Sequence, residues 1–115
     1  MADERVVASV RRYLRTLQTD FGVDARAGVV FGSFARGGAD EWSDIDLVVL
    51  AGRFDQAITR EEVELLWWVA AKVDSRIEPI ACGERQWLED NKSALIEIAR
   101  REGQMILREP LPQTP

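Results

Sequence analysis

Three carboxylates and one Gly-Ser pair are the residues whose types and spacing suit chemistry. Asp44 and Asp46 stand at the start of the apolar run 45–50, and Glu78 lies inside the apolar segment 75–82. In a strand, residues i and i+2 point to the same side, with Cα atoms about 6.6 Å apart. Glu78 either points to solvent from an edge strand or faces the same place as the aspartates. Carboxylate oxygens grouped in this way favour Mg²⁺ or Mn²⁺ over zinc.

Gly32-Ser33 follows the apolar run 27–31, which is typical of a strand that turns sharply into a helix. Such a corner presents backbone N–H groups and a hydroxyl, which together favour phosphate oxygens. Carboxylates, two metal ions and a phosphate-binding corner indicate phosphoryl or nucleotidyl transfer. The chain contains no histidine, which excludes a Ser-His-Asp triad and the usual general base.

The elements that must position these residues follow from the apolar spacing. A capping box formed by Thr59 and Glu62 predicts where one helix begins. Pro79 cannot donate to a ladder, so its strand is expected at a sheet edge. The expected helices are 3–19, 34–36, a helix from 59 to about 73, and 84–101 with a break near Asn91; the expected strands are 27–31, 44–50, 75–82 and 105–107. This order predicts an α/β (α+β) domain with a mixed sheet of four to five strands packed with helices.

Three other side chains are expected to pack in the core. Trp67 and Trp68 widen the apolar face of the helix that starts after Thr59, and at most one of them is expected to be exposed. Cys82 is the single cysteine, so no internal disulfide forms, and a buried apolar role is expected.

Length and composition set limits on the class of protein. The 115 residues suffice for one domain, assigned to 1–108, with 109–115 expected as a disordered tail. The net charge of −5 argues against nucleic-acid binding through the overall field. No apolar run approaches the roughly 20 residues that span a bilayer, and the charged N-terminus is unlike a signal peptide. A cytoplasmic protein without membrane contact is therefore expected.

The motif resembles that of a known family. Gly32-Ser33, ten further residues and then Asp44-Ile45-Asp46 resemble the Gly-Ser-x10-Asp-x-Asp signature of the polymerase β-like nucleotidyltransferases. The flanking residues are similar to the minimal, or MNT-type, branch of bacteria and archaea. The segment around Glu78 resembles the place of their third carboxylate, and 98–107 resembles their closing helix and last strand. The resemblance implies the palm fold of this superfamily.

The same resemblance implies a role for each site residue. The Gly32 backbone and Ser33 would hold the triphosphate, and Asp44 and Asp46 would bind two Mg²⁺ ions, with Mn²⁺ as an alternative. Glu78 would complete the metal site and help to deprotonate the acceptor hydroxyl. Arg36 is expected either to contact phosphate or to fix the loop. Asp74 is a competing third carboxylate, although its place directly after the helix favours Glu78.

MNT-type proteins are typically encoded beside a HEPN-type ribonuclease toxin, which they neutralise by binding it or by transferring AMP from ATP to one of its tyrosines. The resemblance therefore implies a Mg²⁺-dependent protein adenylyltransferase that acts as an antitoxin, in a hetero- or homo-oligomer. One alternative is a binding module that neutralises the toxin without catalysis. A second alternative is an aminoglycoside-type nucleotidyltransferase, which needs an acceptor pocket from another domain or subunit.

Overall fold

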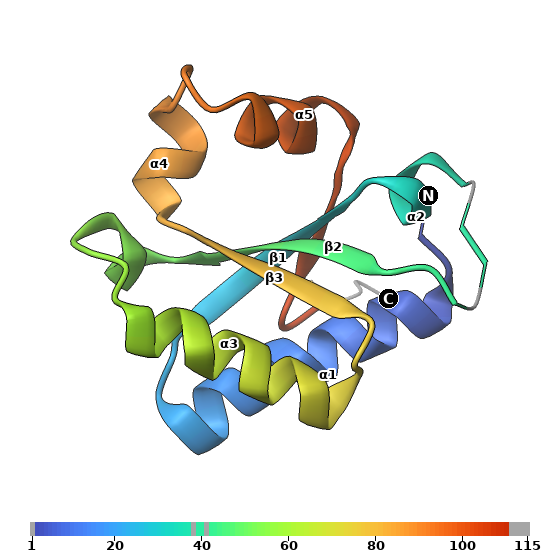
Figure 1. The fold of residues 1–115 in the computed structure, drawn as a ribbon, viewed down its shortest axis with the longest axis horizontal. Coiled ribbons are helices and arrows are strands. Elements are labelled where there is room, and N and C mark those ends of the chain that lie inside the picture. Colours follow the sequence, from blue (N-terminus) through green and yellow to red (C-terminus); the bar gives the residue numbers. More distant parts are fainter. Residues whose placement is uncertain (1, 38, 41, 111–115) are drawn as a thin grey trace, which may run out of the picture.

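One sheet and five helices organise the chain in a computed structural model that describes residues 2–37, 39–40 and 42–110. Figure 1 shows the helices on both sides of the sheet. In chain order the elements are α1 (Glu4–Phe21), β1 (Ala25–Phe31), α2 (Ser33–Arg36), β2 (Ile45–Ala51), the 3₁₀ turn η1 (Gly52–Asp55), α3 (Arg60–Val73), β3 (Ile77–Cys82), α4 (Glu84–Glu89), α5 (Ala94–Glu102) and β4 (Gln104–Leu107).

The sheet is mixed, with the strand order β3-β2-β1-β4. β1 pairs antiparallel with β2 and β4, whereas β2 and β3 are parallel. A parallel pair requires a crossover connection, and α3 supplies it. β3 lies at the edge of the sheet, where Pro79 has no second ladder to satisfy, as its sequence predicts.

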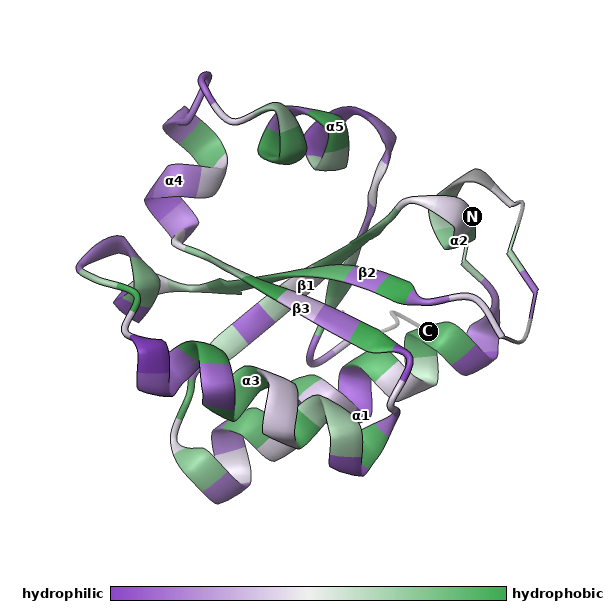
Figure 2. Cartoon of the chain, viewed as in Figure 1, coloured by the Kyte–Doolittle hydropathy of each residue, from purple (hydrophilic) through white to green (hydrophobic). Residues whose placement is uncertain are grey.

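Helices cover both faces of the sheet and enclose two apolar cores. Alternate residues of β2 point to opposite faces of the sheet. Leu47 therefore packs between the sheet and the helices α1 and α3, whereas Val48 packs between the sheet and α5. Tyr13 of α1 lies fully buried in the larger core and donates a hydrogen bond of 2.9 Å to the Leu66 carbonyl oxygen of α3. Figure 2 shows that hydrophobic residues occupy much of the strands, whereas hydrophobic and hydrophilic residues alternate along the helices.

The mixed α+β architecture expected from the sequence is confirmed, including the Thr59 capping box and the break between α4 and α5. Cys82 is buried as expected, and burial raises the pKa of its thiol to about 11. The turn η1 was not anticipated. Of the expected tail 109–115, residues 111–115 lie outside the described residues. No helix in the described ranges is long and apolar enough to cross a membrane.

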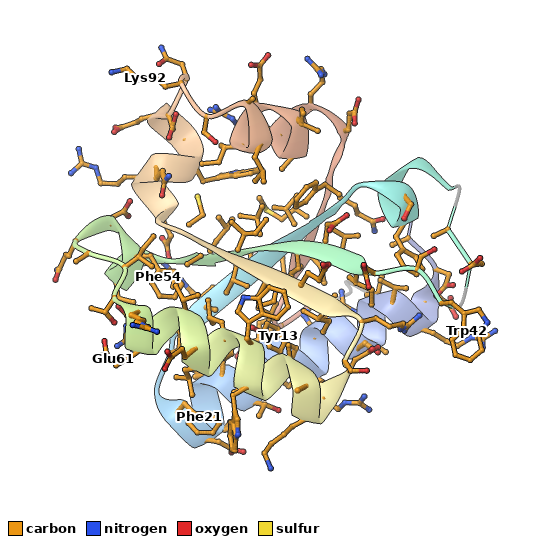
Figure 3. The ribbon with its side chains drawn as sticks, in the orientation of Figure 1. Tyr13, Phe21, Trp42, Phe54, Glu61 and Lys92 are labelled. Carbon is orange, nitrogen blue, oxygen red and sulfur yellow. The ribbon has the colours of Figure 1, made fainter. Side chains whose placement is uncertain are left out.

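The expectation for the tryptophan pair was wrong, because both side chains are about half exposed: Trp67 at 47% and Trp68 at 51%. α3 buries Leu66, Val69 and Ala70, and this stripe turns positions 67 and 68 outward. The rings of Phe21 and Trp68 pack in a T-shaped arrangement, with 5.6 Å between their centroids. Figure 3 shows Phe21 at the end of α1, away from the sheet, with Tyr13 between the helices and the strands.

Candidate active site

A glycine with an unusual backbone forms the corner between β1 and α2. Gly32 has φ 73° and ψ −146°, a combination that is open essentially to glycine alone. A Cβ atom at this position would collide with Oδ2 of Asp46. The corner therefore lies directly against the Asp46 carboxylate, and Ser33 follows as the first residue of α2. This contact links the two halves of the sequence motif.

Strand register brings the carboxylates together. Asp46 pairs with Phe31 of β1 on one side and with Glu78 of β3 on the other. Asp44 precedes β2 by one residue and is exposed, whereas Asp46 and Glu78 are partly exposed. The parallel register therefore places Glu78 beside Asp46, although 31 residues separate them in the chain.

The carboxylates lie on the face of the sheet that carries α4 and α5. These two helices cover only the part of that face that is distant from the carboxylates. By strand alternation Asp46 shares this face with Val48 and Leu50, which belong to the core beneath α5. Figure 1 shows α2 beside the beginning of β2, with α4 and α5 above the other part of the strands. The site is consequently an open surface rather than a closed cavity.

Burial and repulsion from the neighbouring carboxylates both affect the pKa of Glu78. Its pKa is raised above the ordinary value by burial first, and then by the negative charges of Asp44 and Asp46 and a hydrogen bond with Asp44. A divalent cation between these oxygens would relieve the repulsion. The donor set, carboxylate oxygen alone, fits Mg²⁺ or Mn²⁺.

The carboxylates do not by themselves form a complete metal cage. Within residues 2–37, 39–40 and 42–110, no group of three or more His, Cys, Asp or Glu side chains has the arrangement of a metal site. Mg²⁺ usually binds through one or two carboxylates, with waters and substrate phosphates as its other ligands. The carboxylates thus form a partial metal site, which the phosphates of a nucleoside triphosphate would complete.

Asp74, the competing third carboxylate, is engaged elsewhere. It ends α3 and forms a salt bridge of 2.8 Å with Arg76. Hydrogen bonds from the Arg76 side chain are the main reason that the pKa of Asp74 lies below its ordinary value. The structure therefore groups Glu78, and not Asp74, with Asp44 and Asp46.

Arg36 and Arg76 are two further residues to consider at the site. The side chain of Arg36 lies outside the described residues, so its predicted contact with phosphate or with the loop stays a prediction. Arg76 was missed at the sequence level, although its carbonyl oxygen accepts a hydrogen bond of 2.7 Å from the N–H of Ile45, between the two aspartates. Its position two residues before Glu78 was the only signal available.

The apolar hollow of about 370 Å³ beneath α4 is not where the carboxylates lie. Its walls include Ala27 and Leu50, which pair with each other near the far end of β1 and β2. The pair Phe31 and Asp46 lies four residues further along both strands. The hollow is therefore roughly 13 Å from the carboxylates at 3.3 Å per residue.

Comparison with known proteins agrees with the class that the fold and this site define. Residues 10–101 match the model of the nucleotidyltransferase domain family. The chain belongs to this family, as the Gly-Ser and Asp-x-Asp motif predicted.

Two known proteins are similar to this chain, one in sequence and one in fold. One is a protein of Methanocaldococcus jannaschii named "putative protein adenylyltransferase", 40% identical over 50 residues; the match covers 43% of this chain and 34% of that protein. The chain thus spans about a third of the length of this relative. The other is a crystal structure of a "putative nucleotidyltransferase" from Sulfolobus solfataricus, with a TM-score of 0.59 and 15% identity over 88% of this chain and 78% of the other. The second likeness confirms the fold.

Proposed function

We propose that this chain transfers AMP from ATP to a hydroxyl of a partner protein in a Mg²⁺-dependent reaction. The acceptor is a tyrosine of a HEPN-type toxin, and the modification neutralises that toxin, so that the chain acts as an antitoxin. The observation that supports the proposal best is the convergence of Asp44, Asp46 and Glu78 on one face of the sheet, with Asp46 against the Gly32 corner.

Each residue of the site has a separate role in the proposed reaction. The backbone at Gly32 and the Ser33 hydroxyl bind the triphosphate, which directs the α-phosphorus toward the carboxylates. Asp44, Asp46 and Glu78 would hold two Mg²⁺ ions, and ions bound there would neutralise charge on the phosphates and lower the pKa of the attacking hydroxyl. Arg36 is proposed as an additional phosphate contact.

The reaction is a substitution at phosphorus. The acceptor oxygen forms a bond to the α-phosphorus, and the bond from this phosphorus to the bridging oxygen of the β-phosphate breaks. Pyrophosphate leaves with the electron pair of that bond, and Glu78 receives the hydroxyl proton. No histidine is required, which suits a chain that contains none.

The open site supports a macromolecular acceptor. Asp44 is exposed, and Asp46 and Glu78 are partly exposed, so a side chain on the surface of another protein can reach them. The adenylyl group is proposed because the Methanocaldococcus jannaschii relative is named as an adenylyltransferase.

The test is the intact mass of a HEPN-type protein encoded beside this chain, after incubation with the chain, Mg²⁺ and each of the four nucleoside triphosphates. We expect a gain of one or more adenylyl units with ATP, on tyrosine. Asp44→Asn and Asp46→Asn should abolish the gain. Asp20→Asn, on the exposed part of α1, is the matched control and should leave it unchanged.

Other results would contradict the proposal in distinguishable ways. An unmodified toxin in a tight complex, neutralised equally well by Asp44→Asn, would show stoichiometric binding without catalysis. A gain with a different nucleotide would refute the adenylyl assignment while preserving transfer.

A further inference from the structure

We propose that Arg76 is a positioning residue, which holds the phosphate-binding corner at Ser33 in place relative to the carboxylates. The inference rests on the proposed function, because it assigns a role in nucleotide binding. It concerns a residue outside the motif, on a loop between α3 and β3.

The backbone of Arg76 lies at the point where the two carboxylate strands begin. Its carbonyl oxygen accepts the Ile45 N–H at 2.7 Å. Ile45 stands between Asp44 and Asp46, and Glu78 follows Arg76 by two residues. A displacement of Arg76 therefore acts on a segment adjacent to all three carboxylates.

Asp74 holds the guanidinium of Arg76 in one orientation. Nε donates to Oδ1 at 3.1 Å and Nη2 donates to Oδ2 at 2.8 Å, which is a two-point contact. The backbone N–H of Arg76 also donates to Asp74 Oδ1, at 3.0 Å. Three bonds to one carboxylate leave this arginine little rotational freedom.

The oriented guanidinium lies over the ring of Phe34, with 5.7 Å from Cζ to the ring centroid. Phe34 directly follows Ser33 in α2, and its side chain is buried. A cation over an aromatic face is attracted by the ring quadrupole, most strongly where water is excluded. The side chain of Arg76 thus connects α2, a helix of four residues, to the start of β3.

This contact lies on the opposite side of the sheet from the carboxylates. Phe34 and Val6 belong to the core beneath α1 and α3, and together with Arg76 they line a polar hollow of about 280 Å³. Asp46 shares the other face with Val48. Arg76 therefore acts through α2 and not through contact with the reacting atoms.

The side chain of Arg76 is expected to affect nucleotide binding more than the chemical step. A looser α2 displaces Ser33, and an error of about 1 Å in a positioning group costs up to roughly a hundredfold. The Ile45 hydrogen bond uses the backbone carbonyl, which every substitution retains. The carboxylates should therefore stay in place in an Arg76 variant.

The experiment compares Arg76→Met with Arg76→Lys, Phe34→Leu and the control Arg53→Met. Arg53 also forms an ion pair with a largely buried carboxylate, that of Glu62 at 2.9 Å, and this pair is remote from the carboxylate site. We expect Arg76→Met and Phe34→Leu to raise KM for ATP roughly tenfold with kcat within about threefold. Arg76→Lys should be intermediate, because it keeps the charge but not the two-point contact. Arg53→Met should change neither constant.

A combination with Ser33→Ala separates positioning from general loss of structure. If Arg76 acts through Ser33, the double variant Arg76→Met with Ser33→Ala should have a KM no higher than the worse single variant. Multiplied effects, an unchanged KM in Arg76→Met, or a loss of kcat alone would overturn the inference. Because Arg76→Lys and Phe34→Leu are conservative changes, the comparison remains decisive if Arg76→Met folds poorly.

Failure of the proposed function has a different signature. A wild-type chain that modifies no protein contradicts the transfer proposal, whatever the variants do. Amide NMR shifts of the wild type and of Arg76→Lys then still decide the structural part. We expect changes at residues 32–37 and none along α1 beyond Tyr13, and unchanged shifts at residues 32–37 would overturn the positioning role.

Discussion

Asp46 is the residue at which stability and catalysis are expected to conflict. It lies against Gly32, beside Glu78 and near Asp44, so its negative charge adds to a repulsive group. Like charges at this range destabilise a fold unless a cation neutralises them. We therefore expect this group of carboxylates to lower stability in the absence of metal.

Asp46→Asn should accordingly lower transfer by at least about a hundredfold while leaving the melting temperature without Mg²⁺ unchanged or slightly raised. Added Mg²⁺ should raise the melting temperature of the wild type by mass action, and much less that of Asp46→Asn. Thermal melts with Mg²⁺ and with EDTA measure both effects. A melting temperature that falls clearly in Asp46→Asn without metal would show that the carboxylate stabilises the fold.

Gly32 offers a second test at the scale of one residue. Gly32→Ala should lower the free energy of unfolding by about 1–3 kcal/mol and abolish transfer, because it combines a strained backbone with a collision at Asp46. Gly37→Ala is the matched control, since its φ is 80° but a Cβ there meets nothing within 4 Å. It should cost about 1 kcal/mol and keep transfer within a few-fold. Denaturant unfolding and the mass assay measure both, and equal losses of transfer in the two variants would contradict the packing argument.

Local patterns in the sequence sufficed for part of the site. The spacing of Asp44 and Asp46 predicts their common side, because alternation is a property of any strand. The choice between Asp74 and Glu78 was open, because it depends on the register of β3 against β2 and on the salt bridge to Arg76. Neither of these is a local property of the chain.

At the scale of elements, α1 and α3 are joined by one buried hydroxyl. Tyr13 donates to the Leu66 carbonyl oxygen, and burial raises the pKa of Tyr13 above its usual value of 10.0. A group whose folded pKa exceeds its unfolded pKa contributes stability that is complete below the unfolded value and is lost as pH rises above it. Ionisation of Tyr13 is thus expected to destabilise the fold above about pH 10.

Tyr13→Phe should therefore cost about 1 kcal/mol at neutral pH, where only the hydrogen bond is lost. Above pH 10 its stability should decline less steeply than that of the wild type. Urea unfolding from pH 7 to pH 11 measures the two slopes. Cys82→Ala is measured in parallel, because the Cys82 thiol also titrates at the alkaline end. Parallel slopes for wild type and Tyr13→Phe would contradict the assignment.

Elements with local signals were predicted well, and elements without them were not. The capping box at Thr59 depends on two residues that are only three positions apart in the chain. The turn η1 has no such signal. Its Asp55 accepts hydrogen bonds from the N–H groups of Arg85 and Gln86, so it is fastened to α4 from 30 residues away.

At the scale of the whole molecule, helices cover one face of the sheet, and they cover only part of the other face. The larger core lies beneath α1 and α3, and α4 and α5 cover part of the other face. The uncovered end carries the carboxylates. An incompletely covered sheet is thus what makes the site accessible to a macromolecular acceptor.

The inner and outer sides of α3 are expected to contribute unequally to the stability of the fold. Leu66→Ala should lower the free energy of unfolding by about 2–5 kcal/mol, because this side chain is only 1% exposed. Trp67→Gln should change it by about 1 kcal/mol or less, because nearly half of that residue already contacts solvent. Chemical denaturation compares the two. A loss in Trp67→Gln as large as that in Leu66→Ala would place Trp67 in the core, as its sequence pattern had indicated.

The sequence by itself determined the order of the strands and α-helices, the family motif and the pair Asp44 and Asp46, because these depend on residues close together in the chain. Tertiary structure decided that Glu78 joins that pair, that Gly32 lies against Asp46, and that Arg76 reaches Phe34. It also turned Trp67 and Trp68 outward. The physical reason is that strand register and helix rotation are set by packing among segments distant in the chain, and hydrophobic spacing alone does not specify either one.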